Sequence, residues 1–106
     1  MTVLLNGERS RNVVKYICFC QMTPDFLRLP LEERNKWMTD GLEIARKHGL
    51  KVIFWGNSMG VREHVVVVFE SNGISDDYMK FQREWQGLGT PQAGKYIDYS
   101  RTVTVF

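Results

Sequence analysis

The chain has 106 residues, with 14 Lys and Arg against 12 Asp and Glu, 43% apolar residues and two cysteines. That length fits one compact domain with a modest core, in which a deep ligand pocket competes with packing unless a second subunit helps. Charges of both signs are spread along the chain, whereas nucleic-acid binders usually carry a basic stripe. Two cysteines are too few for a secreted disulfide scaffold, no apolar run approaches the roughly 20 residues of a membrane helix, and the first residues lack the apolar segment of a signal peptide. We therefore expect a cytoplasmic protein that binds neither nucleic acid nor membrane.

The first half of the chain predicts an arm, a strand and a helix. Residues 1–12 turn polar after a short apolar patch and are expected to form a loose N-terminal arm. Val13–Met22 is rich in β-branched and aromatic residues and is too short for a typical helix, so it predicts the first strand. A connection over Phe26–Leu29 leads to Pro30, which suits the first position of a helix because its missing N–H would be unpaired there. Apolar residues gather on one face of Leu31–His48, which predicts the first helix.

The second half predicts a hairpin, a helix and a last strand. Leu50–Trp55 and His64–Phe69 are two apolar runs on either side of a glycine-containing turn, a pattern typical of a β-hairpin. Ser75 is a good N-cap for a second helix that runs to about Leu88, with aromatic residues at helical spacing. Lys95–Phe106 then predicts the fourth strand.

The element order β-α-β-β-α-β over residues 13–106 predicts a single α+β domain of the ferredoxin-like type, with a four-stranded antiparallel sheet and two helices on one face. Val65 to Phe69 is apolar at every position, and Tyr16 to Cys20 is apolar or nearly so. Both faces of the sheet are therefore expected to be buried. Since a chain of this length has no third layer, the second face is expected to pack on the same face of another copy, in an obligate homodimer.

The element order over Val13–Phe106, with strands apolar on both faces, resembles the dimeric α+β barrel superfamily, in which two ferredoxin-like sheets pair into a barrel. The resemblance is nearest in style to antibiotic-biosynthesis monooxygenase-like and small cyclase-like members. It implies a small hydrophobic or aromatic ligand between sheet and helices, without a cofactor or a bound metal. The monooxygenase branch implies Asn, Trp and Arg near the pocket, and Trp55, Asn57 and Arg62 are of those types around the hairpin. Haem-binding branches often use histidine, but His48 lies in the last helical turn, where a cation favours the helix dipole and haem ligation is not expected.

His64 and Arg101 are the candidate catalytic residues. His64 opens the third strand, where an imidazole could act as a general acid or base at neutral pH; the alternative is a solvated histidine at a strand end. Strand alternation places Arg101 on one face with four residues of its strand: Ile97, Tyr99, Val103 and Val105. A charge directed to a covered face must be paired, either with an anionic ligand or with an acid such as Asp98 or Glu70 across the dimer.

Five residues are expected to bind a ligand: Tyr16, Trp55, Asn57, Trp85 and Tyr96. Trp55 and Asn57 stand at the mouth of the hairpin. Trp85 lies on the apolar face of a helix, as Trp37 does, so ordinary core packing competes with a pocket role. Tyr16 and Tyr96 stand at strand beginnings, where a hydroxyl serves either a pocket or the rim of the domain.

Two further features have alternative interpretations. Cys18 and Cys20 suggest a metal or redox site, but Cys-x-Cys with no further Cys or nearby His cannot complete a tetrahedral metal site in one chain, so two inert buried thiols are expected. Residues 87–94 are rich in glycine and match neither a phosphate loop nor a dinucleotide motif. They are interpreted as a mobile loop that acts as a lid, or as a plain connection.

Two functions stay open on the sequence. The first is an enzyme without a tightly bound metal, of the monooxygenase, cyclase or isomerase type, acting on an aromatic or polyketide-like compound. The second is a non-catalytic homodimeric module that binds a ligand or a protein partner, which the lack of a defined catalytic constellation favours. RNA binding through the same element order is disfavoured, because the third strand offers valines where an RNA-recognition motif needs exposed aromatic rings.

Overall fold

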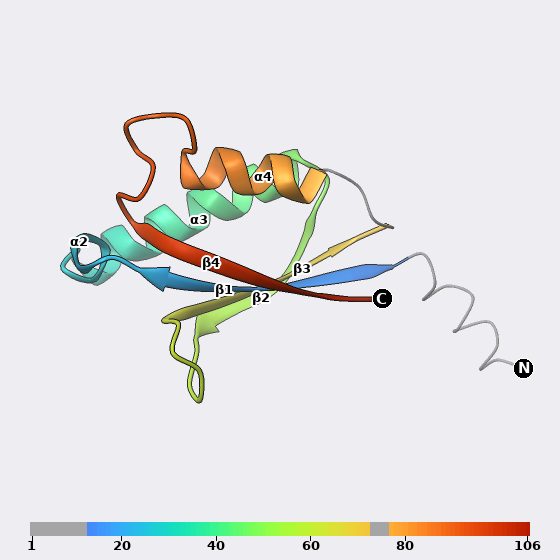
Figure 1. Cartoon of the computed structure of the whole chain (residues 1–106), viewed down its shortest axis with the longest axis horizontal. Helices are drawn as coiled ribbons and strands as arrows, with labels where there is room; N and C mark the ends of the chain where they lie inside the picture. Colours follow the sequence, from blue (N-terminus) through green and yellow to red (C-terminus); the bar gives the residue numbers. More distant parts are fainter. Residues whose placement is uncertain (1–12, 73–76) are drawn as a thin grey trace, which may run out of the picture.

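The computed structural model describes residues 13–72 and 77–106 (Figure 1). Its elements in chain order are β1 (Val14–Met22), α2 (Pro24–Leu27), α3 (Leu31–Lys47), β2 (Lys51–Asn57), β3 (Val65–Ser71), α4 (Asp77–Gln86) and β4 (Ile97–Val105). The predicted N-terminal arm and the predicted N-cap Ser75 lie outside the described residues. None of the helices in the described ranges combines the length and the apolar character needed to cross a membrane.

Within the described residues the sheet has four strands in the order β2-β3-β1-β4, and every neighbouring pair is antiparallel. The two long helices, α3 and α4, lie on one side of this sheet (Figure 1). This arrangement confirms the predicted ferredoxin-like α+β fold, in which each helix connects two strands that run in the same direction.

The segment between β1 and α3 differs from the predicted connection. Residues Pro24–Leu27 form the short helix α2, whose N-cap is Thr23 and whose first residue is Pro24. The Thr23 Oγ1 accepts a hydrogen bond from the Phe26 N–H at 3.3 Å, which satisfies one free amide of the first turn. Pro30 is the N-cap of α3 and not its first helical residue, because its ψ of 149° is extended.

The core fills the space between the sheet and the helices. Alternate residues of β1, from Val14 to Met22, turn their side chains to the helices, and Phe69 and Phe81 are fully buried there. Gly41 of α3 is where the two helices meet, since a Cβ at this position would lie 2.1 Å from the Trp85 Nε1. Only glycine therefore allows the Trp85 indole to pack directly against the α3 backbone.

The opposite face of the sheet is also apolar, as the sequence predicts. The pairing register places Ile17 opposite Val68 on β3 and opposite Val103 on β4. Phe54 also pairs with Val68 and is 55% exposed, and Val103 is 45% exposed. We call this surface the outer sheet face: Ile17, Phe19, Phe54, Val66, Val68, Val103 and Val105.

An irregularity between β1 and β4 changes the predicted face of one residue. The register shifts between Gln21 and Met22, so that Gln21 pairs with Tyr99 but Met22 pairs with Ile97. Asp98 is the additional residue, and Ile97 is 4% exposed within the core. The prediction that Ile97 shares a face with Arg101 is therefore wrong, because a bulge breaks strict alternation along the strand.

Candidate functional site

Three cavities on the helix side of the sheet divide the five predicted ligand residues among them. Tyr16 lines the first, Trp85 and Tyr96 line the second, and Trp55 and Asn57 line the third. The predicted residues therefore do not form one site. We call these cavities the α4 cleft, the aromatic cavity and the Arg34 cavity.

The α4 cleft lies between α4 and the strands β1 and β4, with a volume of about 660 Å³. Its apolar walls include Met79, Leu88 and Phe106, which are all more than half exposed. The remaining lining residues are Tyr16, Tyr78, Gln82, Arg83, Gln86, Ser100, Thr102 and Thr104. The volume lies within the range of about 300 to 1,000 Å³ that is typical of small-molecule sites.

A chain of hydrogen bonds connects the polar residues of the α4 cleft. The Tyr78 hydroxyl lies 2.6 Å from the Thr102 Oγ1 and accepts a hydrogen bond from the Gln82 Nε2 at 2.8 Å. The Gln86 Nε2 donates to the Gln82 Oε1 at 2.6 Å and to the Ser100 Oγ at 2.9 Å. Burial raises the pKa of Tyr78 above its ordinary value, so its hydroxyl is protonated at neutral pH.

Tyr16 contributes its ring more than its hydroxyl to this cleft. The ring is stacked on the Tyr78 ring, with centroids 4.1 Å apart and an interplanar angle of 8°. Because Tyr78 covers one face of the Tyr16 ring, the stacking contributes to the burial of Tyr16, which is only 6% exposed. The stacked pair fixes the rigid aromatic end of the cleft.

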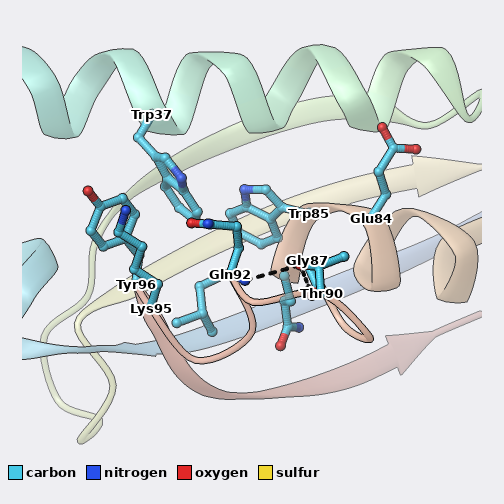
Figure 2. Close-up of a pocket in the computed structure, with 10 residues that line it drawn as sticks. Trp37, Glu84, Trp85, Gly87, Thr90, Gln92, Lys95 and Tyr96 are labelled. Carbon is cyan, nitrogen blue, oxygen red and sulfur yellow. Dashed lines mark hydrogen bonds between the residues drawn. The ribbon is translucent and has the colours of Figure 1, made fainter.

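The aromatic cavity lies between α3, the end of α4 and the loop that follows α4, with a volume of about 320 Å³ (Figure 2). Trp37 and Trp85 are stacked with centroids 5.5 Å apart, and Trp37 meets Tyr96 edge-on at 5.6 Å. Phe81 is also stacked on Trp85, with ring centroids 5.4 Å apart. Because Trp85 stacks on two rings and is only 6% exposed, its main role is packing in the core.

The loop after α4 forms a wall of the aromatic cavity. Gly87, at a φ of 66°, ends the helix in a conformation that side chains disfavour. The Thr90 Oγ1 donates to the Gly87 carbonyl at 2.6 Å and accepts from the Gln92 N–H at 3.1 Å (Figure 2). The Thr23 Oγ1 donates to the Lys95 carbonyl at 2.6 Å. These bonds favour the plain connection over the lid interpretation for residues 87–94.

One carboxylate at the aromatic cavity is already neutralised. Glu84 accepts hydrogen bonds from the Lys47 Nζ at 2.9 Å and lies 3.0 Å from the His48 Nε2. The Lys47 bond and then the His48 bond hold the pKa of Glu84 below its ordinary value. His48 thus takes part, with Lys47, in a hydrogen-bond network that ties α3 to α4.

The Arg34 cavity lies where the first turns of α3 face the end of β2, with a volume of about 230 Å³. Trp55 and Asn57 line it together with Arg34 and Asn35. The other lining residues are Phe26, Leu31, Met38, Gly56 and Val65. Arg62, the arginine that the resemblance placed near the pocket, is exposed and does not line this cavity.

The two predicted catalytic residues lie away from all three cavities. The imidazole Nδ1 of His64 accepts a hydrogen bond from the backbone N–H of Met22 at 3.2 Å. The backbone N–H of His64 donates to the Cys20 carbonyl at 3.1 Å. Arg101 forms a two-point ion pair with Glu63, with Nε to Oε2 at 2.8 Å and Nη2 to Oε1 at 3.1 Å. Both side chains have structural partners, and their catalytic roles stay predictions.

Glu63 is one of the residues that sequence reasoning missed. It is 3% exposed, accepts a hydrogen bond from the Tyr99 hydroxyl at 3.0 Å, and pairs with Arg101 on the outer sheet side. The Arg101 guanidinium also lies 4.3 Å from the centroid of the Phe19 ring. The Arg101 hydrogen bond lowers the pKa of Glu63 to about 2, so the pair is charged at neutral pH. The sequence did predict that Arg101 needs an acidic partner, and in the structure that partner is Glu63. Glu70, one of the two acids suggested by the sequence, pairs with Lys15 at 3.1 Å.

Cys18 and Cys20 are free and buried, with their sulfur atoms 3.6 Å apart. The hydrogen bond to Cys18, together with burial, raises the pKa of Cys20 above its ordinary value. The Gln82 Nε2 donates to the Cys18 Sγ at 3.4 Å, which links the thiols to the polar chain of the α4 cleft. Across residues 13–72 and 77–106, no cluster of three His, Cys, Asp or Glu residues is arranged to hold a metal ion.

No family profile and no curated protein matches the sequence. Solved structures with the same fold include a proposed chlorite dismutase, TA0507, at 18% identity and a TM-score of 0.58, covering 85% of this chain and 41% of that one. An uncharacterised NIPSNAP-like domain protein from Burkholderia xenovorans aligns at 12% identity and a TM-score of 0.56, over 90% of this chain and 84% of that one. A protein of unknown function from Rhodopseudomonas palustris, RPA0582, aligns at 14% identity and a TM-score of 0.53, over 99% and 92%. The chain thus spans about two fifths of the chlorite dismutase-like protein, and identities of this size establish a shared ferredoxin-like fold and no more.

Proposed function

We propose that the protein binds a small, mostly apolar molecule in the α4 cleft. The observation that carries the proposal is the cleft itself: about 660 Å³ of space with apolar walls and a chain of hydrogen-bonding side chains along one side. Exposed side chains such as Met79, Leu88 and Phe106 cost free energy in water, and a ligand in contact with them would remove that cost. The exposed apolar walls of the cleft are not part of the central core, so a ligand can bind there while the core stays packed.

The cleft favours a flat ligand with one polar end. The stacked rings of Tyr16 and Tyr78 form a rigid aromatic surface, and Gln82 and Gln86 carry amide groups that can both donate and accept hydrogen bonds. A bicyclic aromatic alcohol such as 2-naphthol combines these properties and is a suitable probe.

Binding without catalysis is the function that the described residues support best. The Tyr78 hydroxyl already bonds Thr102 and Gln82, and burial raises its pKa, so it is protonated and is a poor base at neutral pH. His64 and Arg101, the residues predicted for acid–base chemistry, lie outside the cleft.

Titration calorimetry with 2-naphthol tests this proposal. The Thr104→Phe variant places a large ring where a small lining residue stands, while Thr39→Phe makes the same change on an exposed position of α3. We expect the wild type and Thr39→Phe to bind with the same affinity, and Thr104→Phe to lose binding. Equal binding by all three proteins would mean that 2-naphthol binds outside the α4 cleft. No binding by the wild type would contradict the proposal that the cleft binds molecules of this kind.

We also propose that the functional unit is a homodimer packed through the outer sheet face. Phe54 and Val103 are 55% and 45% exposed on this face, and a second copy of the same face is an apolar surface of matching shape and twist. The Glu63–Arg101 pair supports this role, because its charges are neutralised within one chain and can be covered.

Sedimentation equilibrium tests the dimer. Val103 and Thr104 are neighbours on β4 that point to opposite faces, so Val103→Glu and Thr104→Glu form a matched pair. The wild type and Thr104→Glu should have the mass of two chains, and Val103→Glu the mass of one. A wild type that stays monomeric at high concentration would contradict the proposal.

A further inference from the structure

Arg34 is a cation of α3 that lacks a carboxylate partner among the described residues. Three other basic residues of this helix have one: Lys36 bonds Asp40 at 2.9 Å, Lys47 bonds Glu84 at 2.9 Å, and Arg46 bonds Glu43. The Arg34 Nε is buried and has no hydrogen-bond partner among residues 13–72 and 77–106. Within the described residues the charge of Arg34 is therefore not balanced by a carboxylate, and an anion that reached its Nη groups would balance it.

The surroundings of Arg34 are those of a small binding site. The side chain lines a cavity of about 230 Å³ with two amide side chains, Asn35 and Asn57, and with the indole of Trp55. Apolar residues complete the walls: Phe26, Leu31, Met38 and Val65. The site therefore has a cation and hydrogen-bond donors in contact with an apolar and aromatic surface.

We propose that the Arg34 cavity binds a compact aromatic carboxylate. The two Nη groups of an arginine together match the two oxygens of a carboxylate, and Asn35 and Asn57 supply further N–H donors. The aromatic body of the ligand would contact Trp55 and the apolar walls. This site lies on α3 and β2, and it goes beyond the ligand proposed for the α4 cleft.

The size of the cavity limits the ligand to one ring. Its volume of about 230 Å³ is below the range of about 300 to 1,000 Å³ found for drug-sized ligands. An inorganic anion such as phosphate would satisfy Arg34 but would leave the apolar walls without contacts. Benzoate fits both requirements, and benzamide has nearly the same shape without the charge.

The experiment is a titration of ¹⁵N-labelled protein with benzoate, followed by NMR through the side-chain N–H signals of Trp55, Asn35 and Asn57. We expect these signals to move and saturate, with a Kd of roughly 1 mM or below for a ligand of this size. Benzamide and inorganic phosphate should bind at least about tenfold more weakly, since each lacks one of the two required features. A wild-type protein whose Trp55 signal is unmoved by benzoate would reject the proposal.

Two arginine variants separate a specific site from general charge attraction. Arg34→Lys keeps the positive charge but removes the paired Nη groups, and we expect benzoate affinity to fall at least about tenfold. Arg46→Lys makes the same change on the exposed side of α3 and should leave the affinity unchanged. Equal affinity of both variants and the wild type would overturn the assignment. A loss of 2-naphthol binding in the α4 cleft would leave this result unaffected, because the signals report different residues.

Discussion

Replacing Gly41 by alanine tests how the two helices are held together. The added Cβ would lie 2.1 Å from the Trp85 Nε1 and 2.6 Å from its Cδ1, far inside ordinary contact. Overpacking of this kind costs about 1 to 3 kcal/mol, and the overlap is deep enough to place the cost near the upper limit. Alanine also stabilises a helix by about 1 kcal/mol relative to glycine. The net loss should be about 2 kcal/mol, which lowers the Tm by roughly 8 to 16 °C.

Thermal unfolding at one protein concentration measures this loss, and two further variants identify its cause. Thr39→Ala, on the exposed side of α3, should not lower the Tm, since it changes helix propensity without packing. In a Trp85→Phe background the cost of Gly41→Ala should fall by at least about 1 kcal/mol, because the smaller ring leaves room for the methyl group. A Gly41→Ala protein more stable than the wild type would refute the close packing of α3 and α4.

Two further predictions concern polar contacts. Because the folded-state pKa of Glu63 is lowered to about 2 from an ordinary 4.5, its pairing stabilises the fold fully above about pH 5 and the contribution is lost as the pH falls toward 2. Urea unfolding should therefore show that Arg101→Gln is less stable than the wild type at pH 7 and that the difference shrinks at pH 3; a difference independent of pH would contradict the ion pair. Tyr78→Phe removes the hydroxyl that joins Thr102 and Gln82, and the free energy of unfolding should fall by about 1 to 2 kcal/mol, whereas an unchanged value would mean that these bonds contribute nothing net.

The elements that the sequence predicted well are those defined by a long periodic pattern. The helix predicted over Leu31–His48 is observed over Leu31–Lys47, and the last strand begins at Ile97 where Lys95 was expected. The apolar centre of the outer sheet face also follows from the sequence, because alternation places Ile17 and Phe19 of β1 and Val66 and Val68 of β3 on that side. These features depend on local spacing, which a single sequence displays directly.

The features that the sequence could not predict depend on contacts between distant segments. The bulge between β1 and β4 near Gln21 and Met22 turns Ile97 toward the core, and no local sequence pattern predicts this bulge. Glu63 precedes β3 by two residues, so strand alternation does not show that its carboxylate reaches Arg101. Arg34 reaches the cavity of Trp55 and Asn57 only because α3 packs along β2, whereas Arg62 is nearer in sequence and stays exposed.

For the candidate site, too, the sequence indicated suitable residue types but not their positions in the fold. The sequence identified residue types suited to an aromatic or apolar ligand, but the fold distributes Tyr16, Trp85 and Trp55 over three separate cavities. Trp85 is buried and stacks on Trp37 and Phe81, which favours the core-packing alternative over stacking on a ligand. Residue type alone could not distinguish these roles, since burial depends on how α4 is seated on the sheet.

The most direct test of ligand binding in the α4 cleft is an NMR titration of ¹⁵N-labelled protein with 2-naphthol. We predict that the side-chain amide signals of Gln82 and Gln86 move and saturate together, while those of Asn35 and Asn57 stay in place. Stationary glutamine signals at saturating 2-naphthol, or movement confined to the asparagines, would contradict binding in this cleft.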